Sequence, residues 1–234
     1  MPYYFYGFDW TYLIIVLPCL ILSIWASANV NSTFRKYSTQ FSSRRITGAD
    51  AAQRVLRANG VSGVRIERVS GDLTDHFDPK SNVIRLSDSV YDSTSTAAIG
   101  VACHEAGHAV QYAVNYAPMK LRAVIIPITN IGSKLAMHLI LLGLLFSMFE
   151  PLITIGIACF SLSVVFQLIT LPVEFNASRR AMQAIEGAQI LTDEERKGAR
   201  KTLTAAALTY VAATIVALAQ LLRLILLFGR RRND

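Results

Sequence analysis

The sequence has little charge and few cysteines, and both shortages exclude whole classes of protein. Charged residues make up 17% of the 234 residues and hydrophobic residues 53%, whereas an average soluble chain is about 25% charged. This composition excludes an intrinsically disordered chain. Three cysteines cannot all pair, and Cys19 and Cys159 lie inside apolar runs, so no disulfide framework is expected. The net charge of +7 does not indicate nucleic-acid binding, because several arginines flank apolar stretches and do not alternate with aromatic residues.

Long uncharged runs indicate a protein of the lipid bilayer. Residues 10–28 carry no charge and are long enough to cross a hydrocarbon core of about 30 Å as a helix. Residues 1–9 contain no basic side chain, so this run is expected to be an uncleaved span and not a secretory signal peptide. Residues 135–171 form two apolar runs interrupted at Glu150, which predicts a helical hairpin. Residues 205–228 predict a fourth span.

The distribution of basic residues predicts the orientation in the membrane. Of the 23 Lys and Arg residues, twelve lie in residues 30–123 and six in residues 172–203. Because basic segments stay on the cytoplasmic side, both segments are expected there, with the N-terminus and Glu150 outside. The three arginines at 230–232 would then lie outside, against the rule, unless the last helix lies in the membrane interface. The side of the C-terminal tail therefore stays open.

The first polar segment predicts a short helix and two short strands. Thr47, with Asp50 three residues later, is typical of a capped helix start. Residues 64–69 alternate apolar and polar side chains, as a half-buried strand does. Turn-forming residues at 78–82 precede the apolar residues 83–86. A small hairpin or sheet is therefore expected before the next helix.

An H-E-x-x-H motif lies on the alanine-rich helix that is expected after residues 93–96. On a helix, His104 and His108 share one face and can bind one metal ion. Glu105 projects beside them, where it can accept a proton from a water at the metal without binding the metal itself. Gly107 is a poor helix former, which suggests that other atoms approach the backbone closely there. The motif predicts a hydrolytic zinc site.

A hydrolytic zinc usually has three protein ligands, and the third has to come from elsewhere in the chain. His138 lies in the apolar hairpin, and His76 lies in a turn-rich stretch. Glu174 is the first carboxylate after the hairpin, which crosses the membrane twice and so returns it to the side of the histidines. It is the preferred third ligand. Glu186 and the acidic residues 193–195 are the alternatives on the same side.

The stretches HEAGHAVQ and PVEFNASRRA, with the hairpin between them, resemble the neutral zinc metallopeptidases of bacterial membranes (the YugP type). The arrangement also resembles the HtpX-type and prenyl-protein-processing membrane proteases. The resemblance covers nearly the whole chain. It implies that zinc is bound by His104, His108 and Glu174, and that Glu105 is the catalytic base.

The resemblance also implies roles for residues around the zinc. Related proteases often carry an acidic residue four positions after the ligand glutamate, where it supports a zinc-bound histidine. This sequence has Ser178 there, with Asn176 nearby, so that supporting role is an open question. The strand predicted at residues 83–86 is expected to line the cleft and to pair with an extended peptide, as the edge of a sheet can.

Other interpretations account for fewer features of the sequence. A site-2-type intramembrane protease needs an aspartate ligand in a later span, and residues 151–171 and 205–228 contain none. An AAA-type protease needs a phosphate-binding loop, which is absent from the sequence. A non-enzymatic membrane scaffold with a structural zinc usually has four ligands, often cysteines, and Cys103 points away from His104 on a helix.

The fold class expected is mainly α: a multi-span helical membrane protein with a small zincin-like α+β cytoplasmic domain that carries the H-E-x-x-H helix. The protein is expected to be a multi-pass zinc endopeptidase of the bacterial cell membrane, surrounded by the lipid bilayer. Its active site is expected to face the cytoplasm, and its substrates are expected to be proteins or peptides. The expected parts are an N-terminal transmembrane span (1–29), a cytoplasmic zincin-like part (30–123), a transmembrane hairpin (124–171), a cytoplasmic segment with the third ligand (172–203), and a C-terminal span with a basic tail (204–234).

Overall fold

The computed structural model describes residues 10–146 and 149–228. The leader at 1–9 and the arginines at 230–232, on which part of the predicted topology depends, lie outside the described residues. The chain divides into two compact units. The apolar unit comprises the described residues of 1–26, 121–171 and 209–234, and the polar unit comprises residues 27–120 and 172–208.

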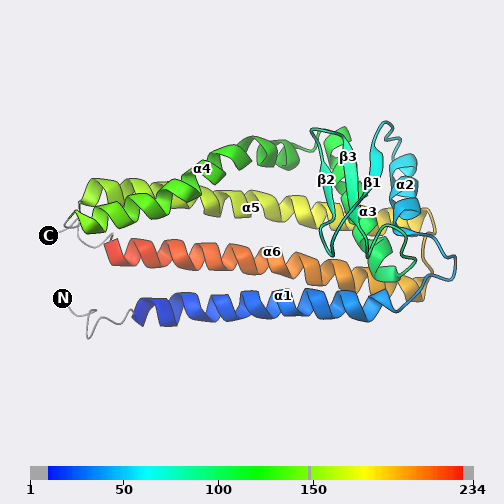
Figure 1. Ribbon diagram of the computed structural model, residues 1–234, viewed down its shortest axis with the longest axis horizontal. Coiled ribbons are helices and arrows are strands. Elements are labelled where there is room, and N and C mark those ends of the chain that lie inside the picture. The colour runs from blue at the N-terminus through cyan, green and yellow to red at the C-terminus, as the bar shows by residue number, and fades with distance from the viewer. Residues whose placement is uncertain (1–9, 147–148, 229–234) are drawn as a thin grey trace. The chain divides into compact units, whose positions relative to one another are not determined.

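The described residues are mainly helical and contain one small sheet, as the sequence predicts. Figure 1 labels the elements, apart from η1, along the chain. They are the π-helix η1 (Tyr12–Val16), α1 (Leu17–Ser38), α2 (Gly48–Ala58), β1 (Arg65–Val69), β2 (His76–Asp78), β3 (Val83–Ser87), α3 (Thr96–Ala113), α4 (Ala117–Leu145), α5 (Glu150–Gly187) and α6 (Asp193–Phe228).

Four helices are long and apolar enough to cross a membrane: Tyr12–Ser38, α4, α5 and α6. Each of them overlaps one of the apolar runs from which the sequence predicts spans. Large apolar side chains of the apolar unit are strongly exposed, among them Ile14 (71%) and Leu145 (76%). Exposed apolar surface of this extent is typical of contact with lipid and not with water. The protein is therefore a membrane protein.

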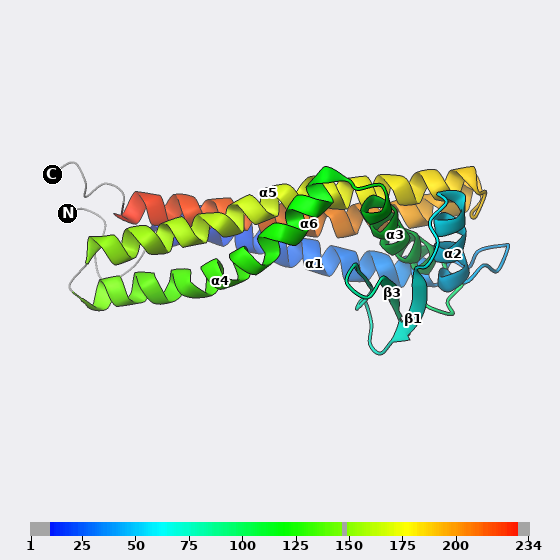
Figure 2. The same ribbon diagram turned by 90° about the horizontal axis from the view of Figure 1, so that it is seen from above.

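In the apolar unit, α4 and α5 pack closely through small residues and form the expected helical hairpin, visible in Figures 1 and 2. A Cβ atom at Gly156 would lie 3.0 Å from the carbonyl oxygen of Ala136. The hydroxyl groups of Ser133 and Ser163 share a hydrogen bond of 2.6 Å. Small residues and hydroxyl hydrogen bonds are the usual means by which membrane helices associate.

In the polar unit, α2 is capped as the sequence predicts. The Thr47 hydroxyl accepts a hydrogen bond from the Asp50 backbone N–H at 3.1 Å, which satisfies one of the free donors of the first turn. Gly60 follows the helix with φ +66°, a conformation that glycine adopts without strain. The apolar side of α2, including Val55 and Leu56, is completely buried.

The sheet differs from the sequence prediction in two ways. It has three strands in the order β1-β3-β2, because the turn-rich stretch around His76 also forms a short strand. β3 is the central strand: it pairs with β1 in parallel and with β2 antiparallel. The expectation that residues 83–86 form a sheet edge that pairs with an extended peptide is therefore wrong, since residues 83–85 are already paired on both sides within the sheet.

The helix α3 runs through the core of the polar unit. Its alanine side chains at positions 97, 98, 102, 106 and 109 are almost completely buried, and they let neighbouring backbones approach. The Ser95 hydroxyl caps its start by accepting from the Ala98 N–H at 3.2 Å. α5 continues without a break through Pro172, so the predicted polar segment after the hairpin begins inside a helix.

Candidate metal centre

Two imidazoles and one carboxylate converge in the polar unit. His104 and His108 come from α3, and Glu174 comes from α5, 66 residues further along the chain. A Glu174 carboxylate oxygen (Oε2) lies 3.2 Å from His104 Nε2 and 3.5 Å from His108 Nε2. One ligand atom from each of the three residues lies within 4.8 Å of those of the other two. The residues that the sequence predicts as metal ligands are therefore brought together.

The spacing of these atoms suits a tetrahedral zinc ion. Zinc binds histidine nitrogen and carboxylate oxygen at about 2.0–2.2 Å in a tetrahedron, whose edges are then about 3.3–3.6 Å long. The carboxylate-to-imidazole distance is 3.5 Å for His108, which lies within that range, and 3.2 Å for His104, which lies just below it. The rings of His104 and His108 are almost perpendicular, at 84°. Two imidazoles and one carboxylate are a donor set found in hydrolytic zinc enzymes.

Gly107 brings the two ligand-bearing helices together. A Cβ atom at this position would lie 2.8 Å from the carbonyl oxygen of Ala177 on α5. The sequence predicts a close approach to the backbone here, and the structure identifies α5 as the approaching element. Because Gly107 lies between the two histidines and Ala177 lies one turn after Glu174, this contact sets the distance across the cluster.

The rotation of α5 follows from its pattern of buried residues. Val173, Ala177, Ala181 and Ile185 are all fully buried, and their four-residue spacing forms one stripe toward the core. Glu174 and Ser178 also lie four residues apart, so they share a face next to this stripe. In this way α5 presents two polar groups to the two histidines of α3.

Both histidines have a hydrogen-bond partner for the second ring nitrogen. His104 Nδ1 lies 3.1 Å from the Ser178 hydroxyl, and His108 Nδ1 lies 3.0 Å from the Gln111 side-chain oxygen. Such partners orient metal-binding imidazoles in proteins. The sequence leaves the role of Ser178 open and gives Gln111 no role. The signal for Gln111 is its position three residues after His108, on the same face of α3.

Buried charge surrounds His108. Burial alone lowers the pKa of His108, but the hydrogen bond to Glu174 and the negative charges of Glu105 and Glu174 outweigh it, so that the pKa is raised above the ordinary value. A buried imidazole beside two carboxylates is a site that favours positive charge. A metal cation satisfies the same preference.

Glu105 lies beside the cluster and is not part of it. The residue is only 8% exposed, and none of the residues 10–146 and 149–228 forms a hydrogen bond or ion pair with its carboxylate. A buried carboxylate normally has partners. Glu105 is therefore free to accept a proton from a molecule that enters the site.

The other candidate ligands lie elsewhere. His76 and His138 are exposed and face backbone carbonyls of Thr74 and Lys134. Cys103 is completely buried in the apolar core, and burial raises the pKa of its thiol, so the thiolate form that binds metal is disfavoured. Glu195 caps the start of α6: its carboxylate accepts from the backbone N–H groups of Ser43 and Thr192.

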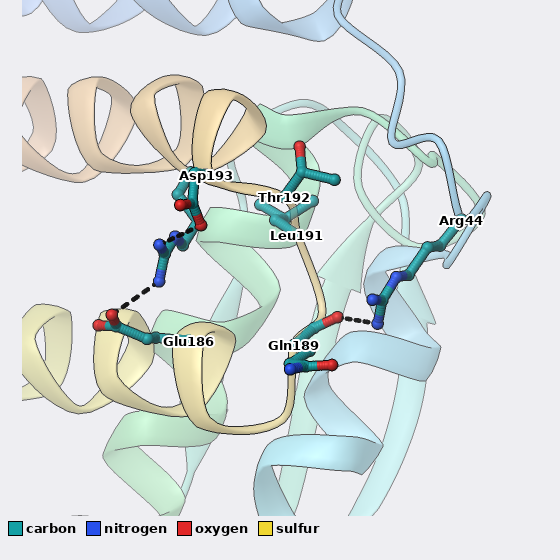
Figure 3. Close-up of a pocket in the computed structure, with 7 residues that line it drawn as sticks. Arg44, Glu186, Gln189, Leu191, Thr192 and Asp193 are labelled. Carbon is teal, nitrogen blue, oxygen red and sulfur yellow. Dashed lines mark hydrogen bonds and ion pairs between the residues drawn. The ribbon is translucent and has the colours of Figure 1, made fainter.

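A separate hollow of the polar unit is lined by charged side chains that already have partners, together with Gln189, Leu191 and Thr192 (Figure 3). Arg196 bridges Glu186, at 2.8 Å, and Asp193. Arg44 donates to the backbone carbonyl of Gln189. Glu186 and Asp193, two of the alternative third ligands, are thus engaged in this hollow and not near the histidines.

Comparisons with known proteins agree with the geometry. The family model described as "Putative neutral zinc metallopeptidase" matches residues 12–229. The chain is 46% identical over 223 residues to the "Putative membrane protease YugP" of Bacillus subtilis (strain 168). The aligned residues cover 95% of this chain and 99% of that protein. No solved structure matches the chain at a significant level. A family match over nearly the whole length, in a chain that brings two histidines and a glutamate together, shows that this protein belongs to the family of neutral zinc metallopeptidases.

Proposed function

We propose that this protein is a zinc-dependent endopeptidase of the bacterial membrane, with His104, His108 and Glu174 as zinc ligands and Glu105 as the catalytic base. One observation carries the proposal: the Glu174 carboxylate lies 3.2 and 3.5 Å from the two imidazoles, beside a second carboxylate, Glu105, that has no partner among the described residues. Membership of the zinc metallopeptidase family supports the same assignment.

The division of labour follows from the chemistry of each group. Zinc, when bound, is a Lewis acid that lowers the pKa of water from 15.7 toward about 7 and polarises a carbonyl. Glu105 accepts the proton of the attacking water as that water adds to the peptide carbonyl, and then donates a proton to the leaving amine. Ser178 and Gln111 hold the two imidazoles in place.

A purely structural zinc site is a weaker explanation. Structural zinc sites usually have four protein ligands, whereas the cluster in the part of the chain that the structure describes has three. A zinc ion held by these three residues would have a fourth position for water or substrate. A carboxylate without a protein partner next to the cluster can serve as the base of a hydrolase, whereas a scaffold has no use for it.

The proposed topology follows from the basic residues. Residues 30–123 and 172–203 hold 18 of the 23 Lys and Arg residues, and we place both on the cytoplasmic side. The spans are then residues 1–29, the hairpin 124–171 and residues 204–234. The active site faces the cytoplasm at the membrane surface, where it meets protein or peptide substrates.

The decisive experiment is Glu105→Gln in purified protein, with Glu194→Gln, an exposed glutamate outside the cluster, as the matched control. Hydrolysis of casein should fall by roughly 10²–10⁴-fold, the usual contribution of a general base. Zinc content should stay at the wild-type level, because Glu105 is no ligand. The proposal is wrong if Glu105→Gln loses its zinc or retains near-normal turnover.

A further inference from the structure

A chain of hydrogen bonds leads from His108 to an arginine on α5. Gln111, which is completely buried, lies 3.0 Å from His108 Nδ1 through its oxygen. Its amide nitrogen donates to the carbonyl of Val173 at 2.8 Å and to the side-chain oxygen of Asn176 at 3.0 Å. The Asn176 oxygen also accepts from Arg180 Nε at 2.8 Å. Gln111, Asn176 and Arg180 are called the relay below.

The direction of each bond in the relay is fixed by groups that play only one role. A guanidinium donates and never accepts, so the atom of Asn176 that faces Arg180 is its oxygen. A backbone carbonyl only accepts, so the atom of Gln111 that faces Val173 is its nitrogen. Both constraints give the Gln111 amide the same orientation. Its remaining atom toward His108 is then an oxygen, which only accepts.

We propose that the relay is a positioning device that holds His108 as the tautomer with the proton on Nδ1, so that the Nε2 lone pair faces Glu174 and the metal. A neutral imidazole has one donor and one acceptor nitrogen, and only the acceptor nitrogen binds zinc. The Gln111 oxygen accepts the Nδ1 proton, and this leaves Nε2 free. The inference rests on the proposed zinc function, and it explains how His108 is held in the orientation that a zinc ligand needs.

The relay gives Arg180 a different task from its neighbour. Two adjacent arginines beside an apolar run would ordinarily be explained as contacts to lipid headgroups. Arg179 is exposed, whereas Arg180 is half-buried and donates to Asn176. The pair therefore offers a matched comparison of two arginines on consecutive positions of one helix.

Zinc affinity of the purified full-length protein tests the relay without reference to catalysis. Competition with a chromophoric chelator should show roughly 10–100-fold weaker zinc binding for Asn176→Leu, the usual effect of losing an outer hydrogen-bond partner of a ligand. Asn176→Asp keeps an oxygen that accepts from both neighbours and should bind zinc within about threefold of wild type. Arg180→Met should weaken binding severalfold, and Arg179→Met should not.

Cobalt spectra distinguish positioning from simple stabilisation. The visible absorption of bound Co²⁺ reports ligand geometry, and it should change in Asn176→Leu but not in Asn176→Asp. Wild-type affinity and spectrum in Asn176→Leu would overturn the relay, even if its melting temperature fell. If Asn176→Leu does not fold, equal zinc affinity of Arg180→Met and Arg179→Met overturns it instead. Normal hydrolysis by Glu105→Gln would overturn the enzymatic proposal alone, and absence of zinc binding by wild type would overturn both.

Discussion

Replacement of Gly107 by alanine should damage the metal site through backbone packing alone. The added Cβ atom would lie 2.8 Å from the Ala177 carbonyl oxygen and 3.4 Å from the carbonyl carbon and Cα of that residue. The obstructing atoms belong to the backbone of α5, so no side-chain rotation relieves the contact. α5 has to move by roughly half an ångström to restore ordinary van der Waals separation.

The size of that movement decides the outcome. Alanine is favoured over glycine in a helix by about 1 kcal/mol, whereas overpacking of a tight interface costs about 1–3 kcal/mol. The net loss of stability is therefore between zero and about 2 kcal/mol, and the fold should survive. Zinc ligands, however, tolerate deviations of only about 0.2 Å. Because Glu174 moves with α5, Gly107→Ala should weaken zinc binding at least roughly tenfold.

The control for this prediction is Gly187→Ala. Gly187 is the last residue of α5, and a Cβ atom there would have no neighbour within 4 Å. The two variants therefore make the same chemical change in the same unit. Zinc affinity by chelator competition and thermal unfolding in detergent should both separate them. The reasoning fails if Gly107→Ala binds zinc as tightly as Gly187→Ala does.

Three further predictions concern the third ligand, the orientation and a buried carboxylate. Glu174→Ala should lower zinc affinity by more than roughly 100-fold and abolish casein hydrolysis, whereas Glu186→Ala should change neither; the reverse pattern would relocate the ligand. A single cysteine at Ser81, in a variant without the native cysteines, should react with an impermeant maleimide only after cell lysis, and labelling of intact cells would reverse the proposed orientation. Burial, together with the charge of Glu105, raises the pKa of Asp75 despite the hydrogen bonds that Asp75 accepts from Ser87. The folded state therefore favours the protonated form of Asp75. The stability that this protonation contributes is lost as the pH rises above about 4. The melting temperature of Asp75→Asn should accordingly fall less than that of wild type between pH 4 and pH 7, and parallel curves for wild type, Asp75→Asn and the exposed control Asp72→Asn would refute this.

Local elements of the fold were predictable because their signals are local. The cap at Thr47, the strand pattern at residues 64–69 and the uncharged runs each depend on a few adjacent residues, and each corresponds to an observed element. The order of the strands was not predictable in this way. β2 has three residues and lies in a stretch rich in turn formers, so its strand character comes from pairing with β3 and not from its own sequence.

The candidate site shows the same division between local and distant information. The spacing of His104 and His108 is a property of one helix, so it was readable from the motif. The relay was not, because the hydrogen bonds of Gln111 reach α5 more than 60 residues away, and nothing near Gln111 indicates which groups will face it. The role of Ser178, which the sequence leaves open, also depends on contact between distant segments: its hydroxyl lies 3.1 Å from His104 Nδ1.

The position of Glu174 follows from a pattern that the sequence does contain. Residues 173, 177, 181 and 185 are apolar at four-residue spacing, and the structure buries all four. Such a stripe fixes which face of α5 turns toward the core, and Glu174 and Ser178 then share the adjacent face. Because Gly107 lets the α5 backbone approach α3 closely at Ala177, that face lies against His104 and His108. The glutamate is thus brought to the histidines by apolar burial and a missing side chain, before any metal contributes.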